Sequence, residues 1–66
     1  MVFKDFIEIY DNWDARIRIN DNTLRIIIDA RGLNIYDNVG LMSAIGNKEV
    51  VAFGFYDKEL CIRLNI

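Results

Sequence analysis

The segment ARIRINDNTLRIIIDA, residues 15–30, decides the fold of this chain. Apolar and polar residues alternate through its first part, which is the period of a half-buried β-strand. The alternation resumes after the polar run NDNT, and Asn and Asp tolerate the positive φ angles that tight hairpin turns require. The segment therefore predicts a β-hairpin with Asp21 and Asn22 as a two-residue loop.

This loop fixes a register for the hairpin. The predicted cross-strand pairs on its apolar face are Ile19 with Leu24, Ile17 with Ile26, and Ala15 with Ile28. A slip of one residue would move the apolar residues of one strand into water, so the pattern itself specifies the register. The opposite face would then carry Arg18 directly across from Arg25, with Arg16 diagonal to it. Opposed like charges destabilise a sheet, so we expect a neighbouring carboxylate or an anionic ligand to compensate them.

Residues 50–66 repeat this logic and predict a second hairpin, with Asp57 and Lys58 as its loop. Its register pairs Tyr56 with Glu59. The residues predicted to share its apolar face are Val51, Phe53, Phe55, Leu60, Ile62 and Leu64. No Pro occurs in the chain, so an unprotected strand edge is a candidate for strand addition between chains.

Residues 2–12 fit two structures. Phe3, Phe6, Ile7 and Tyr10 have helical spacing, whereas the alternation around Ile7 and Ile9 also suits a strand. We favour a short amphipathic helix, because the apolar face of the first hairpin needs a second layer to cover it. Residues 11–12 would close this helix, and Trp13 would pack at the corner before the first strand.

Residues 31–49 have the least regular pattern. Residues 33–36 are compatible with a short strand, and residues 41–45 with either one helical turn or a short strand. Asp37 and Asn38 fit a turn or a helix N-cap, and residues 46–48 a turn into the second hairpin. The predicted fold is a single α+β domain over residues 1–66, in which a short N-terminal helix packs on an antiparallel sheet of four to five strands built from two hairpins.

Composition limits what this domain can be. A chain of 66 residues buries only about 60% of its unfolded surface, yet 53% of this one is hydrophobic. We therefore expect part of the apolar surface to meet another chain, most simply a second copy in a homodimer. The net charge of −2, from ten acidic and eight basic residues, is not typical of a general nucleic-acid binder.

The chain offers little for catalysis. It has no His, which removes the usual general base and the commonest metal ligand, and no nucleophile has a base partner. We expect no enzyme activity, no catalytic residues, no cofactor and no metal site. Cys61 is the only cysteine, so no internal disulfide forms and a reducing compartment fits. No signal peptide or membrane span is visible, and we expect a cytoplasmic protein with no membrane partner.

Arginines are the best candidates for a binding site. The residues predicted to bind a partner or an anion are Arg16, Arg18, Arg25, Arg63, Tyr56 and Tyr36. In one interpretation, the arginines form a solvated sheet face offset by Asp14, Asp29 or Glu59. In the other, their guanidinium groups bind a carboxylate or phosphate, and Tyr56 adds stacking on a nucleotide.

The order of three segments carries a resemblance. FKDFIEIYDNWDARIRI, then TLRIIID, then EVVAFGFYDKELCIRL resembles short accessory proteins of phages and mobile elements of Gram-positive bacteria. Some proteins of this kind inhibit host defences such as CRISPR systems by stoichiometric binding. The resemblance transfers no functional residue. The predicted arginine face also has the wrong sign of charge for an inhibitor that mimics DNA.

Together these observations predict a non-enzymatic protein-binding module. With the resemblance, they point to a phage-encoded inhibitor that binds a host protein or complex in the host-cell cytoplasm. Two alternatives remain open. One is a nucleotide- or nucleic-acid-binding module that uses the arginine-bearing sheet face. The other is a structural or assembly protein that works by strand addition.

Overall fold

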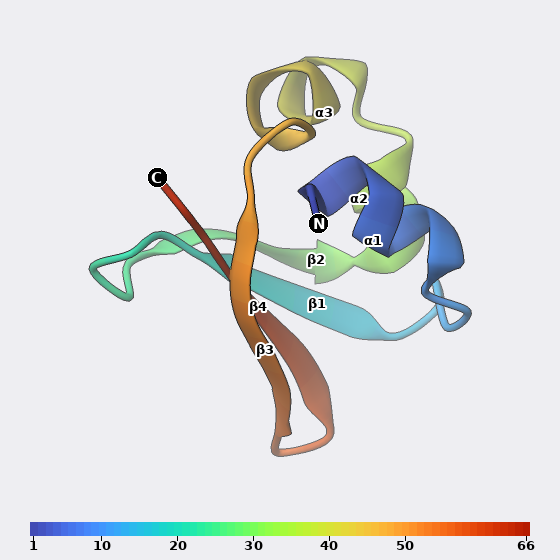
Figure 1. Cartoon of the computed structure of the whole chain (residues 1–66). Helices are drawn as coiled ribbons and strands as arrows, with labels where there is room; N and C mark the ends of the chain where they lie inside the picture. Colours follow the sequence, from blue (N-terminus) through green and yellow to red (C-terminus); the bar gives the residue numbers. More distant parts are fainter.

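Three short helices lie over one face of a four-stranded sheet in the computed structural model, which describes residues 1–66 (Figure 1). The helices are α1 (Phe3–Ile9), α2 (Gly32–Tyr36) and α3 (Val39–Ile45). The strands are β1 (Arg16–Asn20), β2 (Ile26–Arg31), β3 (Val50–Tyr56) and β4 (Glu59–Leu64). The expected α+β class, the N-terminal helix and the two hairpins are confirmed.

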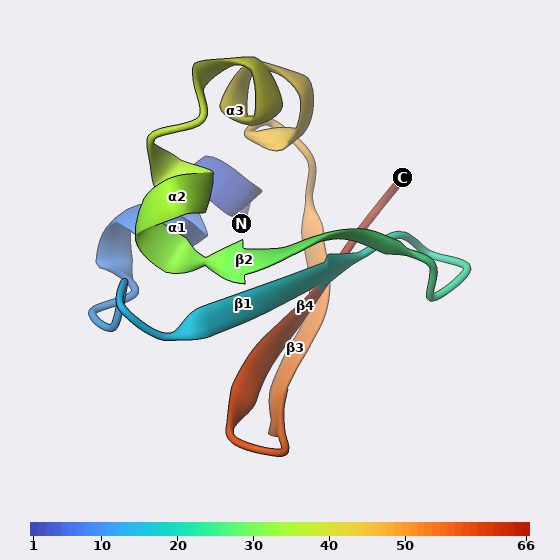
Figure 2. The same cartoon turned by 180° about the vertical axis from the view of Figure 1, so that it is seen from behind.

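The sheet is mixed: both hairpins are antiparallel, as expected, and the contact between them is parallel. Its strand order is β2-β1-β4-β3, in which each hairpin is antiparallel and β1 pairs with β4 in parallel (Figure 2). The chain leaves β2 through α2 and α3 and returns along the far edge as β3. Strand β4 then runs between β3 and β1, so the two most regularly alternating strands occupy the centre. No fifth strand forms.

The core is built on these central strands. The nine buried apolar side chains are Phe3, Ile7, Ile17, Ile19, Ile35, Ile45, Leu60, Ile62 and Leu64. Five of them come from β1 and β4, where every second residue points to the helical layer. Phe3 and Ile7 are four residues apart on α1 and both are fully buried, which decides residues 2–12 in favour of a helix.

Trp13 ties the end of α1 to the next segment. Its indole Nε1 donates a hydrogen bond to the carbonyl oxygen of Ile7 at 3.0 Å, and its ring stacks on Tyr36 with centroids 4.5 Å apart. The predicted corner position of Trp13 is therefore confirmed. Helix α1 ends earlier than expected, at Ile9, and the Tyr10 amide donates to the carbonyl of Phe6 at 3.1 Å.

Residues 33–36 belong to α2, so the expected short strand is wrong. The segment turns immediately after β2 because the amide of Leu33 donates to the carbonyl of Trp13 at 2.9 Å. Gly32 permits this contact, since a Cβ there would lie 3.1 Å from the Trp13 backbone. The helical alternative for residues 41–45 is confirmed as α3, and Asn38 is its N-cap, accepting from the Leu41 amide at 3.0 Å.

The predicted register of the first hairpin is wrong. Strand β1 pairs Ile17 with Ala30, Arg18 with Asp29 and Ile19 with Ile28. The connection spans residues 21–25 because the Asp21 carboxylate organises a wider loop than the expected two-residue turn. Its Oδ1 accepts from the Thr23 amide at 2.8 Å, the Thr23 hydroxyl at 2.7 Å and the Arg25 amide at 3.0 Å. Arg18 consequently faces Asp29 and not Arg25.

The second hairpin has the predicted register at its tip. Tyr56 pairs with Glu59, and the loop residues Asp57 and Lys58 both have positive φ, at 52° and 67°. The positive φ at both loop residues is the geometry of a type I′ turn, which matches the twist of the strands. The pairs of Phe55 with Leu60 and Phe53 with Ile62 are also confirmed.

Farther from the tip, the second hairpin departs from expectation. Val50, and not Val51, pairs with Leu64, because a bulge lies between Val50 and Ala52. Phe53 and Phe55 are each 63% exposed although their partners on β4 are buried. The hairpin extends beyond the helical layer, so nothing in the chain covers this end of the sheet (Figures 1 and 2). The apolar face predicted for this hairpin is therefore buried on β4 but not at Phe53 and Phe55.

Two single substitutions, one at buried Ile62 of β4 and one at exposed Phe55 of β3, test which side chains of the second hairpin stabilise the fold. Ile62→Ala leaves a cavity under fully buried neighbours and should lower the free energy of unfolding by about 2–5 kcal/mol. Phe55→Ala removes an exposed ring and should change it by roughly 0.5 kcal/mol or less. Urea unfolding followed by circular dichroism measures both. Equal losses in the two variants would contradict the exposed position of Phe55.

Candidate functional site

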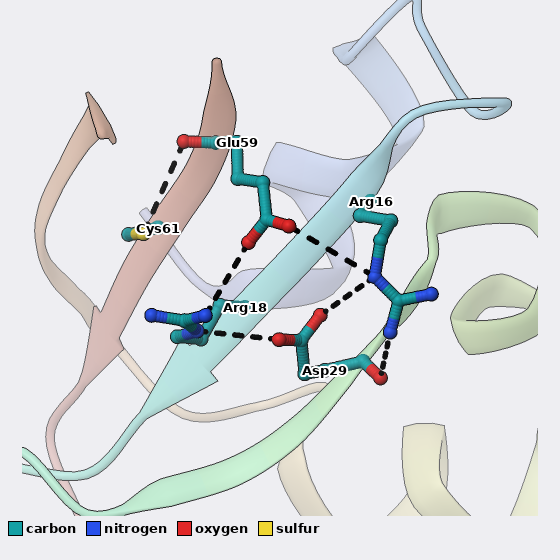
Figure 3. A network of polar contacts seen from close by, with 5 residues as sticks. All are labelled: Arg16, Arg18, Asp29, Glu59 and Cys61. Carbon is teal, nitrogen blue, oxygen red and sulfur yellow. Dashed lines mark hydrogen bonds and ion pairs between the residues drawn. The ribbon is translucent and has the colours of Figure 1, made fainter. Parts of the chain in front are cut away.

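The sheet face opposite the helices, called here the outer face, carries a four-residue ionic network. Arg16 Nε lies 3.1 Å from Asp29 Oδ1 and Arg18 Nε lies 3.3 Å from Asp29 Oδ2. Glu59 approaches the same two arginines, at 4.0 Å from Arg16 and 3.5 Å from Arg18 (Figure 3). The residues come from β1, β2 and β4, and the parallel pairing of β1 with β4 brings Glu59 into the network.

The network neutralises its own charge. Two guanidinium groups face two carboxylates, so the compensation expected for the arginines comes from within the chain. The hydrogen bond from Arg18 to Asp29, partly opposed by desolvation, raises the pKa of Arg18 above its ordinary value. Asp29 and Glu59 therefore compete with any external anion for Arg16 and Arg18, although each guanidinium keeps N–H donors that no carboxylate engages. Exposed ion pairs of this kind contribute little to stability.

The other predicted site residues do not join this network. Arg25 is exposed in the connection between β1 and β2, and Tyr36 stacks on Trp13 on the helical side of the molecule. Arg63 lies on the outer face, where it pairs with Asn20 of β1 and Ala52 of β3. No carboxylate lies within ion-pair distance of Arg63 or Arg25.

Tyr56 and Arg63 line one shallow pocket of about 100 Å³ on the outer face. Asn20 also lines it, and the Asn20 Oδ1 atom is buried without a hydrogen-bond partner. The pocket therefore brings a cation and a phenol together beside this buried, unpaired acceptor. It holds a few water molecules or a small polar group, but it is well below the roughly 300–1,000 Å³ typical of pockets for nucleotides and similar ligands.

A larger and more open groove of about 460 Å³ lies where α1 ends. Glu8, Asp11 and Asp14 line it together with Trp13 and Leu33. Its carboxylates favour positively charged groups, and Asp14 already accepts a 2.7 Å hydrogen bond from Arg31. No three His, Cys, Asp or Glu side chains are placed to hold a metal ion. The helices have five to seven residues, and none is long and apolar enough to cross a membrane.

A feature that the sequence pattern did not predict is an aromatic row across the helical side of the sheet. The Phe6 ring lies 6.3 Å from the Tyr10 ring and 5.1 Å from the Phe53 ring. Phe55 continues the row on the same face of β3, two residues beyond Phe53. We call Tyr10, Phe6, Phe53 and Phe55 the aromatic row. It runs from the covered core to the open end of the hairpin.

The difference in length between α1 and β3 is the signal that could have predicted the exposed end of the aromatic row. A helix of seven residues is about 10 Å long, whereas a strand of seven residues spans about 23 Å. Helix α1 therefore covers less than half of the length of β3. The aromatic residues at the far end of β3 have to remain uncovered unless another element reaches them.

The pH dependence of stability tests the role of the Asp21 carboxylate in the loop between β1 and β2. Hydrogen bonds from the Thr23 side chain and the Arg25 amide lower the pKa of Asp21 in the folded chain. A lowered pKa contributes stability above the pKa of the unfolded chain, near 3.8, and this contribution disappears as pH falls through the folded value. Asp21→Asn keeps the acceptor oxygen but removes the titrating group. Thermal unfolding between pH 6 and 2, at constant ionic strength, should therefore show a smaller acid-induced loss in Asp21→Asn. Identical pH profiles would contradict this role.

Removing the carboxylates of the ionic network tests whether they suppress anion binding. The double substitution Asp29→Asn and Glu59→Gln keeps side-chain size and leaves Arg16 and Arg18 without acidic partners. Retention on a heparin column should rise relative to the natural sequence and fall again with added salt. A further Arg18→Gln substitution in the double variant should reverse the gain. Unchanged retention of the double variant would show that Asp29 and Glu59 do not limit access to the arginines.

Comparisons with known proteins give no relative of this chain. No family model, curated protein or solved structure matches it.

Proposed function

We propose that this chain is a non-enzymatic protein-binding module and that the aromatic row is its contact surface. The observation that carries the proposal is the exposure of Phe53 and Phe55, each 63%, next to each other on one face of an uncharged strand. Single exposed apolar residues are normal on protein surfaces, but adjoining aromatic rings are typical of interaction sites.

The energetic argument follows from the exposed area. An aromatic side chain buries about 150–250 Å² when it is covered, so each of these rings leaves roughly 100 Å² or more in water. At about 25 cal/mol per Å², covering one ring stabilises a complex by about 3 kcal/mol before the costs of association. Phe6 packs against Phe53 with centroids 5.1 Å apart, which holds that ring in place before a partner arrives. A rigid ring loses little conformational entropy on binding.

The charge distribution supports a protein partner more than a nucleotide. The outer-face arginines Arg16 and Arg18 are engaged with Asp29 and Glu59, and the pocket beside Arg63 is small for a nucleotide. The aromatic row has no charged member and lies on the other side of the sheet from these arginines. It offers apolar area and ring edges, which suit a protein surface.

The resemblance to phage and mobile-element proteins supports a more specific form of the proposal. In that form the partner is a bacterial protein of a defence complex, and the chain inhibits it by stoichiometric occupation of a surface. The aromatic row would supply the contact, and no catalytic step would be needed.

Affinity capture from bacterial lysate with matched variants tests the proposal. The double substitution Phe53→Ala and Phe55→Ala removes the exposed part of the row, whereas Val39→Ala removes an exposed apolar side chain from α3. The natural chain and Val39→Ala should retain the same protein at a fixed molar ratio. The double variant should lose it and remain folded by circular dichroism.

The captured protein is then purified and titrated calorimetrically against the three chains. Loss of two hot-spot rings should weaken the binding by at least about 100-fold, since each 1.4 kcal/mol is tenfold. Equal affinity of the natural chain and the double variant would refute the aromatic row as the contact surface. Absence of any defined partner across lysates of several bacteria would refute the protein-binding function itself.

A further inference from the structure

Strand β3 is an edge of the sheet, and its second half has none of the usual protection. Apart from the Val50 amide, which donates to the Met1 carbonyl at 2.9 Å, β3 is hydrogen-bonded only to β4. Its sequence VVAFGFY contains no charged residue and no Pro. Edge strands of soluble proteins are normally blunted by Lys, Pro, bulges or a covering element. The bulge at Val51 disturbs only the first part of β3, and its tip extends beyond the helical layer (Figure 1). The segment from Ala52 to Tyr56 is therefore free to pair.

The register tells which backbone groups face the open side. Tyr56 and Glu59 flank a two-residue loop, so they form a hydrogen-bonded pair, and the alternation of an antiparallel ladder makes Gly54 with Cys61 the next one. Phe55 lies between these two pairs, and Phe53 lies between Gly54 and the next pair, Ala52 with Arg63. Their backbone N–H and C=O groups consequently point away from β4 toward the edge. Each copy thus presents two donors and two acceptors at the spacing of a β-ladder.

A second copy of the chain fits this edge. Strand β3 is uncharged, so antiparallel pairing with itself opposes no like charges, whereas β2 at the other edge carries Asp29 and Arg31. Residues opposite each other in an antiparallel pair must both direct their hydrogen-bonding groups inward. The register that uses all the free groups near the strand centre therefore places Phe53 opposite Phe55 of the other copy and Gly54 on the two-fold axis.

Side-chain sizes agree with this register. It sets Tyr56 of one copy opposite Ala52 of the other on the outer face, and Gly54 opposite Gly54. Tyr56 leans over Gly54 within its own chain, since a Cβ on Gly54 would lie 3.3 Å from the ring. The small residues leave room for the two tyrosines near the axis.

We propose that two copies of this chain pair antiparallel through β3, with Gly54 on the axis, to form one continuous eight-stranded sheet. The interaction uses the backbone edge of β3, and it shares the rings of Phe53 and Phe55 with the aromatic row. The exposed areas of Phe53, Phe55 and Tyr56 sum to roughly 400 Å² per copy, so these side chains bury at most about 800 Å² in the pair, less than the roughly 1,200 Å² of stable specific complexes. The dimer should therefore dissociate on dilution.

Sedimentation equilibrium over a wide concentration range tests the pairing. The natural chain should move from one to two times its 7.7 kDa mass as concentration rises. Phe55→Ala and Phe55→Pro both lack the ring, but only the proline also lacks the outward N–H, which an edge strand can lose without breaking its own ladder. The two-fold dimer loses two hydrogen bonds in Phe55→Pro, so its association should be about 30-fold weaker than that of Phe55→Ala.

Ile27→Lys places a charge on β2 at the opposite edge and is the matched control, which should dimerise like the natural chain. Phe55→Lys gives a second variant should Phe55→Pro fail to fold, and it should be monomeric. A natural chain that stays monomeric at millimolar concentration overturns the proposal, as does equal dimerisation of the alanine and proline variants. A monomeric natural chain that still captures a partner through the aromatic row would refute this pairing and leave the proposed function intact.

Discussion

The parallel pairing of β1 with β4 is the contact on which the rest of the structure depends. It aligns Ile17 with Leu60 and Ile19 with Ile62, and these four side chains form the floor of the core. The same register sets Arg18 beside Cys61 and brings Glu59 into reach of the arginines on the other face. One long-range alignment therefore determines both the packing of the helical side and the charge balance of the outer face. Without it, each hairpin would expose its apolar face.

The sequence predicted what local chemistry controls. The tip of the second hairpin followed from two turn residues between alternating strands, and Asn38 from the preference of Asn for the start of a helix. The first hairpin shows how local chemistry can mislead. The backbone tolerance of Asp favours a tight turn at Asp21, but its carboxylate accepts three hydrogen bonds and opens a longer loop. A side chain that competes with the ladder for backbone donors shifted the register.

The sequence pattern could not predict the tertiary arrangement of the strands. Alternation alone does not distinguish a parallel neighbour from an antiparallel one, so the position of β4 between β1 and β3 could not be anticipated. The same limit applies to the candidate site. Arg16 and Arg18 were correctly identified as outer-face residues, yet their partner Asp29 depended on the register. Phe53 and Phe55 had a core pattern, and their exposure depended on how far the helices extend.

The chain order of the central strands also affects how this protein can fold. Each hairpin closes locally, but Ile17 and Leu60 are separated by most of the chain, and the helices and β3 must be traversed before they meet. The entropic cost of closing such a long loop must be overcome before the contact can stabilise the fold. The two hairpins can form early, while the parallel seam between them closes late and completes the core. Until then the uncharged edge of β3 and the apolar faces of both hairpins are exposed, and the nascent chain is most open to association at that stage.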